Sequence, residues 1–207
     1  TANSGSVAIK FHALMGDAEM ELLAAKHFTD RVLAISVRMP LGGAMLRSDV
    51  VATRLRDGDV KVSTVTNLDY SISVGEVLVY MFAEYFRNGF GVSKMPTSIA
   101  MLPMPLQSRL ARGEVFNVMR DYTAVGVAIP WHPLVNQSLA FLSNLHDSSS
   151  FLQTSVTYDP GDRQRLQLGL VKPLGRAGDE FGGVPLNGAA FTTGAGARLF
   201  FRWQYYF

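Results

Sequence analysis

Residues 197–207, at the end of the chain, read Ala-Arg-Leu-Phe-Phe-Arg-Trp-Gln-Tyr-Tyr-Phe. At the two-residue period of a β-strand, one face of this stretch is apolar throughout. That face carries Ala197, Leu199, Phe201, Trp203, Tyr205 and Phe207. The other face carries two arginines. In a soluble core, a chain that ends on a buried aromatic residue would bury its terminal carboxylate nearby, which is costly. The pattern therefore favours a strand with lipid on one side and water on the other.

This alternation, ending in Phe207, resembles the C-terminal signature of Gram-negative outer-membrane β-barrel proteins. The resemblance implies that Phe207 is the assembly signal read by the barrel-assembly machinery during biogenesis. It also implies a location in the bacterial outer membrane, with outer-membrane lipids and lipopolysaccharide as partners.

The composition agrees with such a protein. Of the 207 residues, 48% are hydrophobic and only 17% are charged, yet no stretch approaches the roughly 18 uninterrupted apolar residues of a membrane helix. Spread hydrophobicity with 19 glycines and 11% aromatic residues is typical of a transmembrane barrel, where lipid-facing and lumen-facing residues alternate. A soluble all-β protein is the alternative.

The net charge, the cysteine content and the first residues of the chain narrow the possible protein classes only slightly further. The net charge of +2 comes without a basic run or a basic patch interleaved with aromatic residues, so we expect no nucleic-acid partner. The absence of cysteine fits passage through an oxidising periplasm. The polar residues 1–6 do not read as a signal peptide, and we expect a mature chain.

Two-residue alternation predicts eleven strands, separated by turns such as Gly16–Asp17 and Asp159–Asp162. The predicted strands cover residues 7–15, 19–27, 33–38, 45–56, 60–72, 76–88, 115–129, 135–145, 152–158, 166–170 and 197–207. Two long loops, 87–113 and 175–194, are expected on the external side. No helix is expected, although 19–28 could be read as one.

The predicted number of strands, eleven, is odd, which does not fit a closed single-chain barrel. Bacterial single-chain barrels have an even number of strands with both ends in the periplasm. Three interpretations remain: a missed or merged strand gives ten or twelve, the chain is the C-terminal part of a larger barrel, or a second chain or a missing N-terminal segment completes the wall. The predicted fold is thus an all-β transmembrane antiparallel β-barrel of about 10–12 strands. It spans residues 1–207 as a single domain or as part of one.

Several segments are similar to the C-terminal half of large proteobacterial outer-membrane barrels. They are residues 42–49, 67–70, 83–91, 146–148 and 180–183. This resemblance covers most of the chain and implies no activity. It favours a fragment or half-barrel.

The alternation also predicts which side chains face the lumen. The candidate pore-lining residues are Lys10, His12, Glu21, Arg38, Arg47, Asp49, Lys61, Asp69, Glu84, Arg165, Arg198 and Arg202. Mixed charge of this kind indicates either a hydrated pore or a plugged interior with paired charges. The arginines of the last strands would favour anions, unless they form cross-strand ion pairs. The candidate lipid-interface aromatic residues are Tyr70, Tyr85, Trp131, Trp203 and Tyr205.

Enzymatic chemistry has weak support. The four histidines, His12, His27, His132 and His146, are too scattered for a metal site, and no cofactor is expected. His146 and Ser148 are hydrolase residue types, as in outer-membrane lipid hydrolases. A triad, however, needs residues that converge from separate segments. We therefore expect a porin-like passive channel for small solutes, with no enzymatic activity. The alternative is a non-conducting structural barrel or half-barrel that anchors or completes a larger outer-membrane complex.

Overall fold

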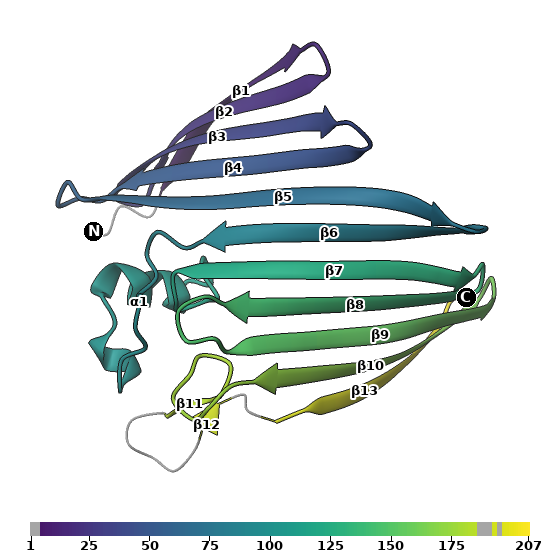
Figure 1. Cartoon of the computed structure of the whole chain (residues 1–207). Coiled ribbons are helices and arrows are strands. Elements are labelled where there is room, and N and C mark those ends of the chain that lie inside the picture. The colour runs from purple at the N-terminus through teal and green to yellow at the C-terminus, as the bar shows by residue number, and fades with distance from the viewer. Residues whose placement is uncertain (1–4, 186–191, 194–195) are drawn as a thin grey trace.

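The structure is a computed structural model that describes residues 5–185, 192–193 and 196–207. Eleven antiparallel strands form one sheet in chain order (Figure 1). They are β1 (Ser6–Met15), β2 (Ala18–His27), β3 (Asp30–Leu41), β4 (Ala44–Arg54), β5 (Val60–Val74), β6 (Val77–Arg87), β7 (Asp121–His132), β8 (Val135–Asn144), β9 (Ser150–Gly161), β10 (Gln164–Leu174) and β13 (Arg198–Tyr205). The predicted all-β antiparallel sheet is confirmed. In this structure the sheet is not closed.

Small elements accompany the sheet. Strands β11 (Val184–Pro185) and β12 (Thr192–Thr193) pair with each other. The connection from β6 to β7 contains a 3₁₀ turn, η1 (Ile99–Met101), and a short helix, α1 (Met104–Ala111). Within the residues that the structure describes, no helix is long and apolar enough to cross a membrane.

The two ends of the sheet differ. At one end, β1 to β2, β3 to β4, β5 to β6, β7 to β8 and β9 to β10 are each joined by two residues. We call this the turn end, and the chain also finishes there. The opposite end, which we call the loop end, carries the long connections 88–120 and 175–197. Figure 1 shows α1 and β11–β12 together at this end.

The pleat gives the sheet one apolar face. The register places Leu22 opposite Ile35, and Ile35 opposite Val50, so the same face continues from strand to strand. It runs on to β13, where Leu168 of β10 lies opposite Phe201. The side chains are open to the surroundings: Leu199 is 74% exposed and Phe201 is 68% exposed. We call this the apolar face and the opposite one the polar face.

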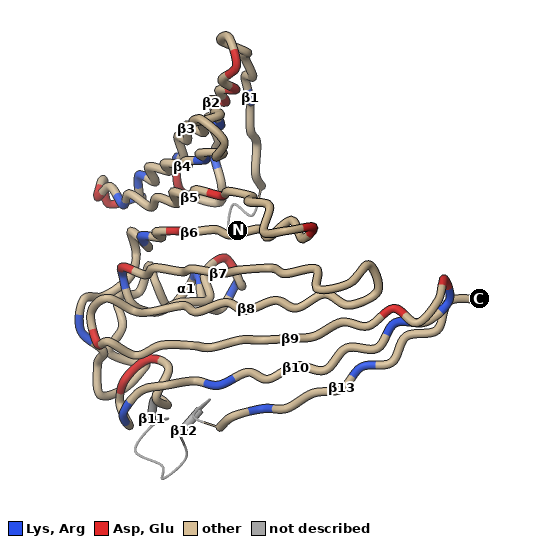
Figure 2. The backbone as a smooth tube through the Cα atoms, turned by 45° about the vertical axis from the view of Figure 1, so that its right-hand side comes forward, with Lys and Arg blue, Asp and Glu red and all other residues tan. Residues whose placement is uncertain are grey.

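The sheet has two unpaired edges. In the described structure β1 pairs only with β2, and β13 only with β10. Figures 1 and 2 show these strands at opposite ends of a strongly curved sheet, with β1–β4 folded out of the plane of β6–β10. Both edge strands run from the loop end to the turn end. A direct pairing of the two would therefore be parallel.

Buried apolar side chains collect on the polar face at the loop end, and sheet-to-sheet packing contributes none of them. Leu102, Leu106, Met119 and Tyr122 are the buried hydrophobic residues among those described. All four belong to the 88–120 connection or to the start of β7. The core thus forms where this connection folds back onto the sheet.

Three sequence predictions are wrong in detail. The predicted strand 115–129 begins only at Asp121, because the backbone amides of Val118 and Met119 donate to Glu180 of another loop and leave the ladder. The predicted turn at Asp159–Asp162 lies mainly within β9, and residues 162–163 make the reversal. Helix α1 occupies a segment predicted to contain only loop, with Pro105 in its first turn, where a missing amide hydrogen costs nothing.

The predicted loop boundaries differ as well. The connection predicted over 87–113 extends to residue 120. The loop predicted over 175–194 contains β11 and β12, while its residues 186–191 and 194 lie outside the described part of the chain.

Candidate functional site

The polar face carries pairs of opposite charge on neighbouring strands. Lys10 Nζ lies 2.8 Å from Glu21 Oε1, and Arg38 Nη1 donates to Glu19 Oε2 at 2.8 Å. Arg47 pairs with Asp69 across β4 and β5. These contacts join cross-strand neighbours on one face of a pleated sheet, and they offset part of the charge there.

All twelve candidate pore-lining residues lie on this polar face. The register brings together Lys10, His12 and Glu21 on β1 and β2, Arg38, Arg47 and Asp49 on β3 and β4, Lys61, Asp69 and Glu84 on β5 and β6, and Arg165, Arg198 and Arg202 on β10 and β13. That they line a pore stays a prediction.

The arginines of the last two strands differ in their partners. Arg165 donates two hydrogen bonds to Asp159, at 2.7 and 2.9 Å, so its charge is offset. Arg198 and Arg202 form no ion pair within the described residues. Both are exposed. They leave a positive strip along the β13 edge.

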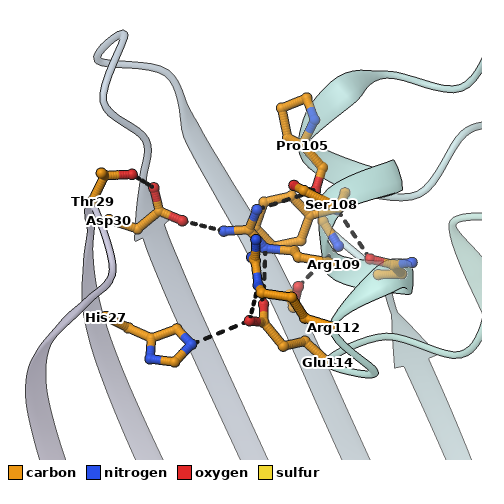
Figure 3. A network of polar contacts seen from close by, with 12 residues as sticks. His27, Thr29, Asp30, Pro105, Ser108, Arg109, Arg112 and Glu114 are labelled. Atoms are coloured by element: carbon orange, nitrogen blue, oxygen red, sulfur yellow. Dashed lines mark hydrogen bonds and ion pairs between the residues drawn. The ribbon is translucent and has the colours of Figure 1, made fainter. Parts of the chain in front are cut away.

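A network of ion pairs holds α1 against the polar face at the loop end (Figure 3). Arg109 pairs with Asp30 at the start of β3, and it also donates to the carbonyl of Pro105 at 3.1 Å. The Arg109 and Asp30 side chains are only 8% and 12% exposed. The guanidinium also stacks over Phe90, 3.8 Å from the ring centroid. The connection that begins at β6 is thereby fixed to β3, three strands away.

Glu114 extends this network to β2. Arg112 Nε donates to Glu114 at 2.5 Å, and His27 Nε2 lies 3.2 Å from the same carboxylate. The pairing with Arg112, assisted by His27 and Arg109, holds the pKa of Glu114 below its usual range. Arg112 also lies over the ring of Phe28. Sequence reasoning missed this cluster, because no local period links 27–30 to 109–114.

A cavity of about 560 Å³ lies beside the network, between α1 and the turns at 28–30 and 55–57. Its charged lining is mixed, with Asp30 and Asp57 alongside Arg56, Arg109 and Arg112. This space is large enough for a small solute.

The second long loop also folds onto the polar face. Glu180 accepts hydrogen bonds from the Val118 amide at 2.6 Å, from the Tyr122 hydroxyl at 2.6 Å and from the Asn144 side chain at 2.9 Å. Phe181 packs against the rings of Tyr122 and Phe151. Burial raises the pKa of the Glu180 carboxyl, although its donors partly oppose the shift. Both long connections therefore cover part of the polar face at the loop end.

Two glycines allow close backbone contacts of the first connection, Gly89 with β5 and Gly91 with Met119 near the end of the same connection. A Cβ at Gly89 would lie 2.4 Å from the backbone oxygen of Val62, and one at Gly91 would lie 2.2 Å from that of Met119. Only a residue without a side chain fits between these backbones.

The candidate aromatic residues gather at the turn end of the apolar face, with one exception. Tyr70, Trp131, Trp203 and Tyr205 lie there and are exposed, and Trp131 Nε1 donates to Gln137 at 2.8 Å. Tyr85 is at the loop end, where its hydroxyl donates to Asp121 at 2.7 Å. Phe207 follows β13 and is fully exposed. Their contact with lipid, and the role of Phe207 in assembly, stay predictions.

The hydrolase residues do not converge. His146 Nε2 lies 2.8 Å from Asp121, and the exposed Ser148 has no hydrogen bond to it in the described structure. The neighbouring Ser149 is buried and donates to Asp147 at 2.7 Å. Within residues 5–185, 192–193 and 196–207, no three His, Asp or Glu side chains form a metal-binding group.

Comparison with known proteins adds little. No family model matches the sequence, and no curated protein matches it. One solved structure, described as the NanC porin in a rhombohedral crystal form, aligns with 98% of this chain and 93% of its own. The sequence identity is 7% and the TM-score is 0.41, so the fold assignment here depends on the sheet itself.

The Arg109–Asp30 pair is testable by removing one partner. Arg109→Met leaves the Asp30 carboxylate nearly buried and unpaired, a loss typically of about 3–5 kcal/mol. We expect faster amide hydrogen exchange across 99–114. Lys94→Met, on the same connection but exposed and without an ion pair in the described structure, is the control. Exchange at the wild-type rate in Arg109→Met would contradict the anchoring role.

The raised pKa of Glu180 predicts a pH dependence of the second loop. The folded protein retains the Glu180 proton over a pH range above 4.5 in which the unfolded chain has lost it. Docking of 175–183 should therefore weaken as the pH rises through the raised pKa and strengthen on acidification towards 4.5. The protection factor of this loop at pH 5 and pH 7, which is the intrinsic exchange rate at each pH divided by the observed rate, measures the effect.

The matched variants separate Glu180 from general charge effects. Glu180→Gln should remove this pH dependence, whereas Asp179→Asn should retain it, because among the described residues the Asp179 side chain accepts a hydrogen bond only from the Arg176 amide. Equal slopes in the wild type and Glu180→Gln would show that another group governs the docking.

Proposed function

We propose that the chain forms the wall of a porin-like β-barrel in the bacterial outer membrane. In this proposal the apolar face contacts lipid and the polar face lines a water-filled passage for small solutes. The carrying observation is that one face has exposed apolar side chains on all eleven strands, whereas the opposite face has cross-strand ion pairs on β1–β5 and a further ion pair between β9 and β10. A membrane barrel needs this asymmetry, because its outside meets hydrocarbon and its inside meets water.

The asymmetry of the two ends supports the same proposal. Outer-membrane barrels have short periplasmic turns and long external loops, with aromatic residues at the lipid boundary. Here the two-residue links and the exposed Trp131, Trp203 and Tyr205 share the turn end. We therefore assign the turn end to the periplasm and the loop end to the outside.

The passage is charged and constricted in this proposal. Arg198 and Arg202 carry the excess positive charge, which favours anions. The 88–120 and 175–183 loops narrow the external mouth, through the Arg109 and Glu180 contacts. The chain is proposed to act without catalysis.

A second candidate function is favoured by the open edges. The chain would then be a non-conducting half-barrel that completes or anchors a larger outer-membrane assembly. Because β1 and β13 run in the same direction, closure with only antiparallel pairs needs an odd number of additional strands. These would come from a preceding segment of the same protein or from a second chain.

Ion conductance in planar bilayers tests the passage. The double variant Arg198→Glu/Arg202→Glu should move the reversal potential towards cation preference, because it reverses the unpaired charges of the strip. The control exchanges a paired charge without changing the net charge: Asp159→Arg/Arg165→Asp should keep the wild-type reversal potential.

The same recordings distinguish the two candidate functions. Conductance steps whose selectivity follows Arg198 and Arg202 support the passage. A bilayer that stays closed, with protein that has inserted and retains a second chain through detergent, would contradict the passage and support the half-barrel.

A further inference from the structure

A row of basic residues crosses the apolar face at the loop end. Lys26 of β2 lies opposite Arg31 of β3, and Arg31 lies opposite Arg54 of β4. Direct cross-strand neighbours of like charge destabilise a sheet. All three side chains are exposed and form no ion pair among the described residues. The sheet thus retains a repulsive arrangement that an anionic partner would relieve.

The acidic residues nearby are engaged elsewhere or lie outside the row. Asp30 is on the polar face, where it pairs with Arg109. Asp59, in the turn that follows β4, pairs with Lys61 at 2.8 Å. Asp57 of the same turn accepts the Asp59 amide at 3.0 Å and lines the cavity near α1, which shares Thr29, Leu55 and Arg56 with the pocket beside the basic row.

A pocket accompanies the basic row. It has a volume of about 310 Å³, and Arg31, Arg54 and Arg56 line it together with Thr29, Leu55 and Gly58. No acidic residue contributes to this lining. Guanidinium groups bind phosphate oxygens through paired hydrogen bonds, and three of them can hold more than one phosphate.

The surroundings of the pocket identify the rest of the ligand. The next row towards the turn end consists of Ala24, Leu33 and Ala52, and the row after it of Leu22, Ile35 and Val50. Leu33 is 61% exposed. A phosphate bound at the arginines would therefore have an apolar surface directly beside it, which suits acyl chains and does not suit a free ion.

We propose that this pocket and the apolar rows beside it bind a lipid that carries two or more phosphate groups, as lipopolysaccharide does. The phosphates contact Arg31, Arg54 and Arg56, Lys26 borders them, and the acyl chains lie along β2–β4. The proposal deepens the proposed function and depends on it, because it requires the apolar face to be in a membrane with the loop end outside.

The test uses the full chain refolded in detergent. Diphosphoryl lipid A, monophosphoryl lipid A, phosphatidylethanolamine and inorganic phosphate are compared by native mass spectrometry and by thermal unfolding. We expect diphosphoryl lipid A to bind about tenfold more tightly than the monophosphoryl form, because one charge-assisted phosphate contact is lost. Phosphatidylethanolamine and inorganic phosphate should bind more weakly still.

Two variants give the mutational arm. Arg31→Gln/Arg54→Gln should lose the lipid A stabilisation, yet be at least as stable as the wild type without lipid, because the like-charge contacts are gone. Lys94→Gln/Arg163→Gln removes two exposed positive charges elsewhere and should retain lipid A binding.

Three results would overturn the proposal. They are equal affinity for diphosphoryl lipid A and phosphatidylethanolamine, undiminished binding by Arg31→Gln/Arg54→Gln, and inorganic phosphate as effective as the lipid. Insertion into vesicles, followed by protease protection, is measured in parallel. Protein that inserts without lipid preference overturns only this proposal, whereas protein that never inserts overturns the proposed function.

Discussion

The backbone hydrogen bonds of the strands are the constraint on which the rest of this structure depends. In hydrocarbon no water replaces a missing partner, so each peptide group needs a neighbouring strand. The nine strands from β2 to β10 have two neighbours each, whereas β1 and β13 have one. With Val7 and Leu199 about three-quarters exposed, these edges are also the most open parts of the apolar face. In a membrane the edges require further strands or each other, and their common direction decides what kind of partner fits.

Because the strands pair in a single sheet, few side chains are buried by the packing of one sheet on another. The two long loops supply most of the buried contacts instead. Arg109 with Asp30, and Glu180 with Tyr122 and Asn144, fasten two connections to the polar face. No buried side-chain nitrogen or oxygen of the described residues lacks a partner. Charges in this region are thus satisfied in pairs, whereas Arg31, Arg54, Arg198 and Arg202 stay outside any ion pair of the described chain. Arg31 and Arg54 lie on the apolar face, whereas Arg198 and Arg202 lie on the polar face. For this reason we propose a phosphorylated lipid as the anion at the apolar face and small anionic solutes at the polar face.

The sequence predicted features that depend on neighbouring residues of one strand. It did not predict features that depend on contacts between residues far apart in the chain. The face of a strand on which a side chain lies depends only on a two-residue period. Each of the twelve candidate lumen residues could therefore be assigned to one face before any pairing was known. The start of β7 could not be assigned, because Val118 and Met119 give their amides to Glu180, about sixty residues later in the chain. Helix α1 has only eight residues, too few for a helical period to stand out, and tertiary contacts through Arg109 hold it. The basic row on β2–β4 was missed because it appears only when three strands are aligned.

The environment of successive side chains on β13 shows most directly whether the sheet is a membrane wall. The chain has no cysteine, so single cysteines at Leu199, Phe200, Phe201, Arg202 and Trp203 can be spin-labelled one at a time in lipid vesicles. We expect a two-residue period: high oxygen accessibility at 199, 201 and 203, and high accessibility to a water-soluble nickel reagent at 200 and 202. Uniform water accessibility at all five positions would contradict a membrane wall and would indicate a soluble all-β protein.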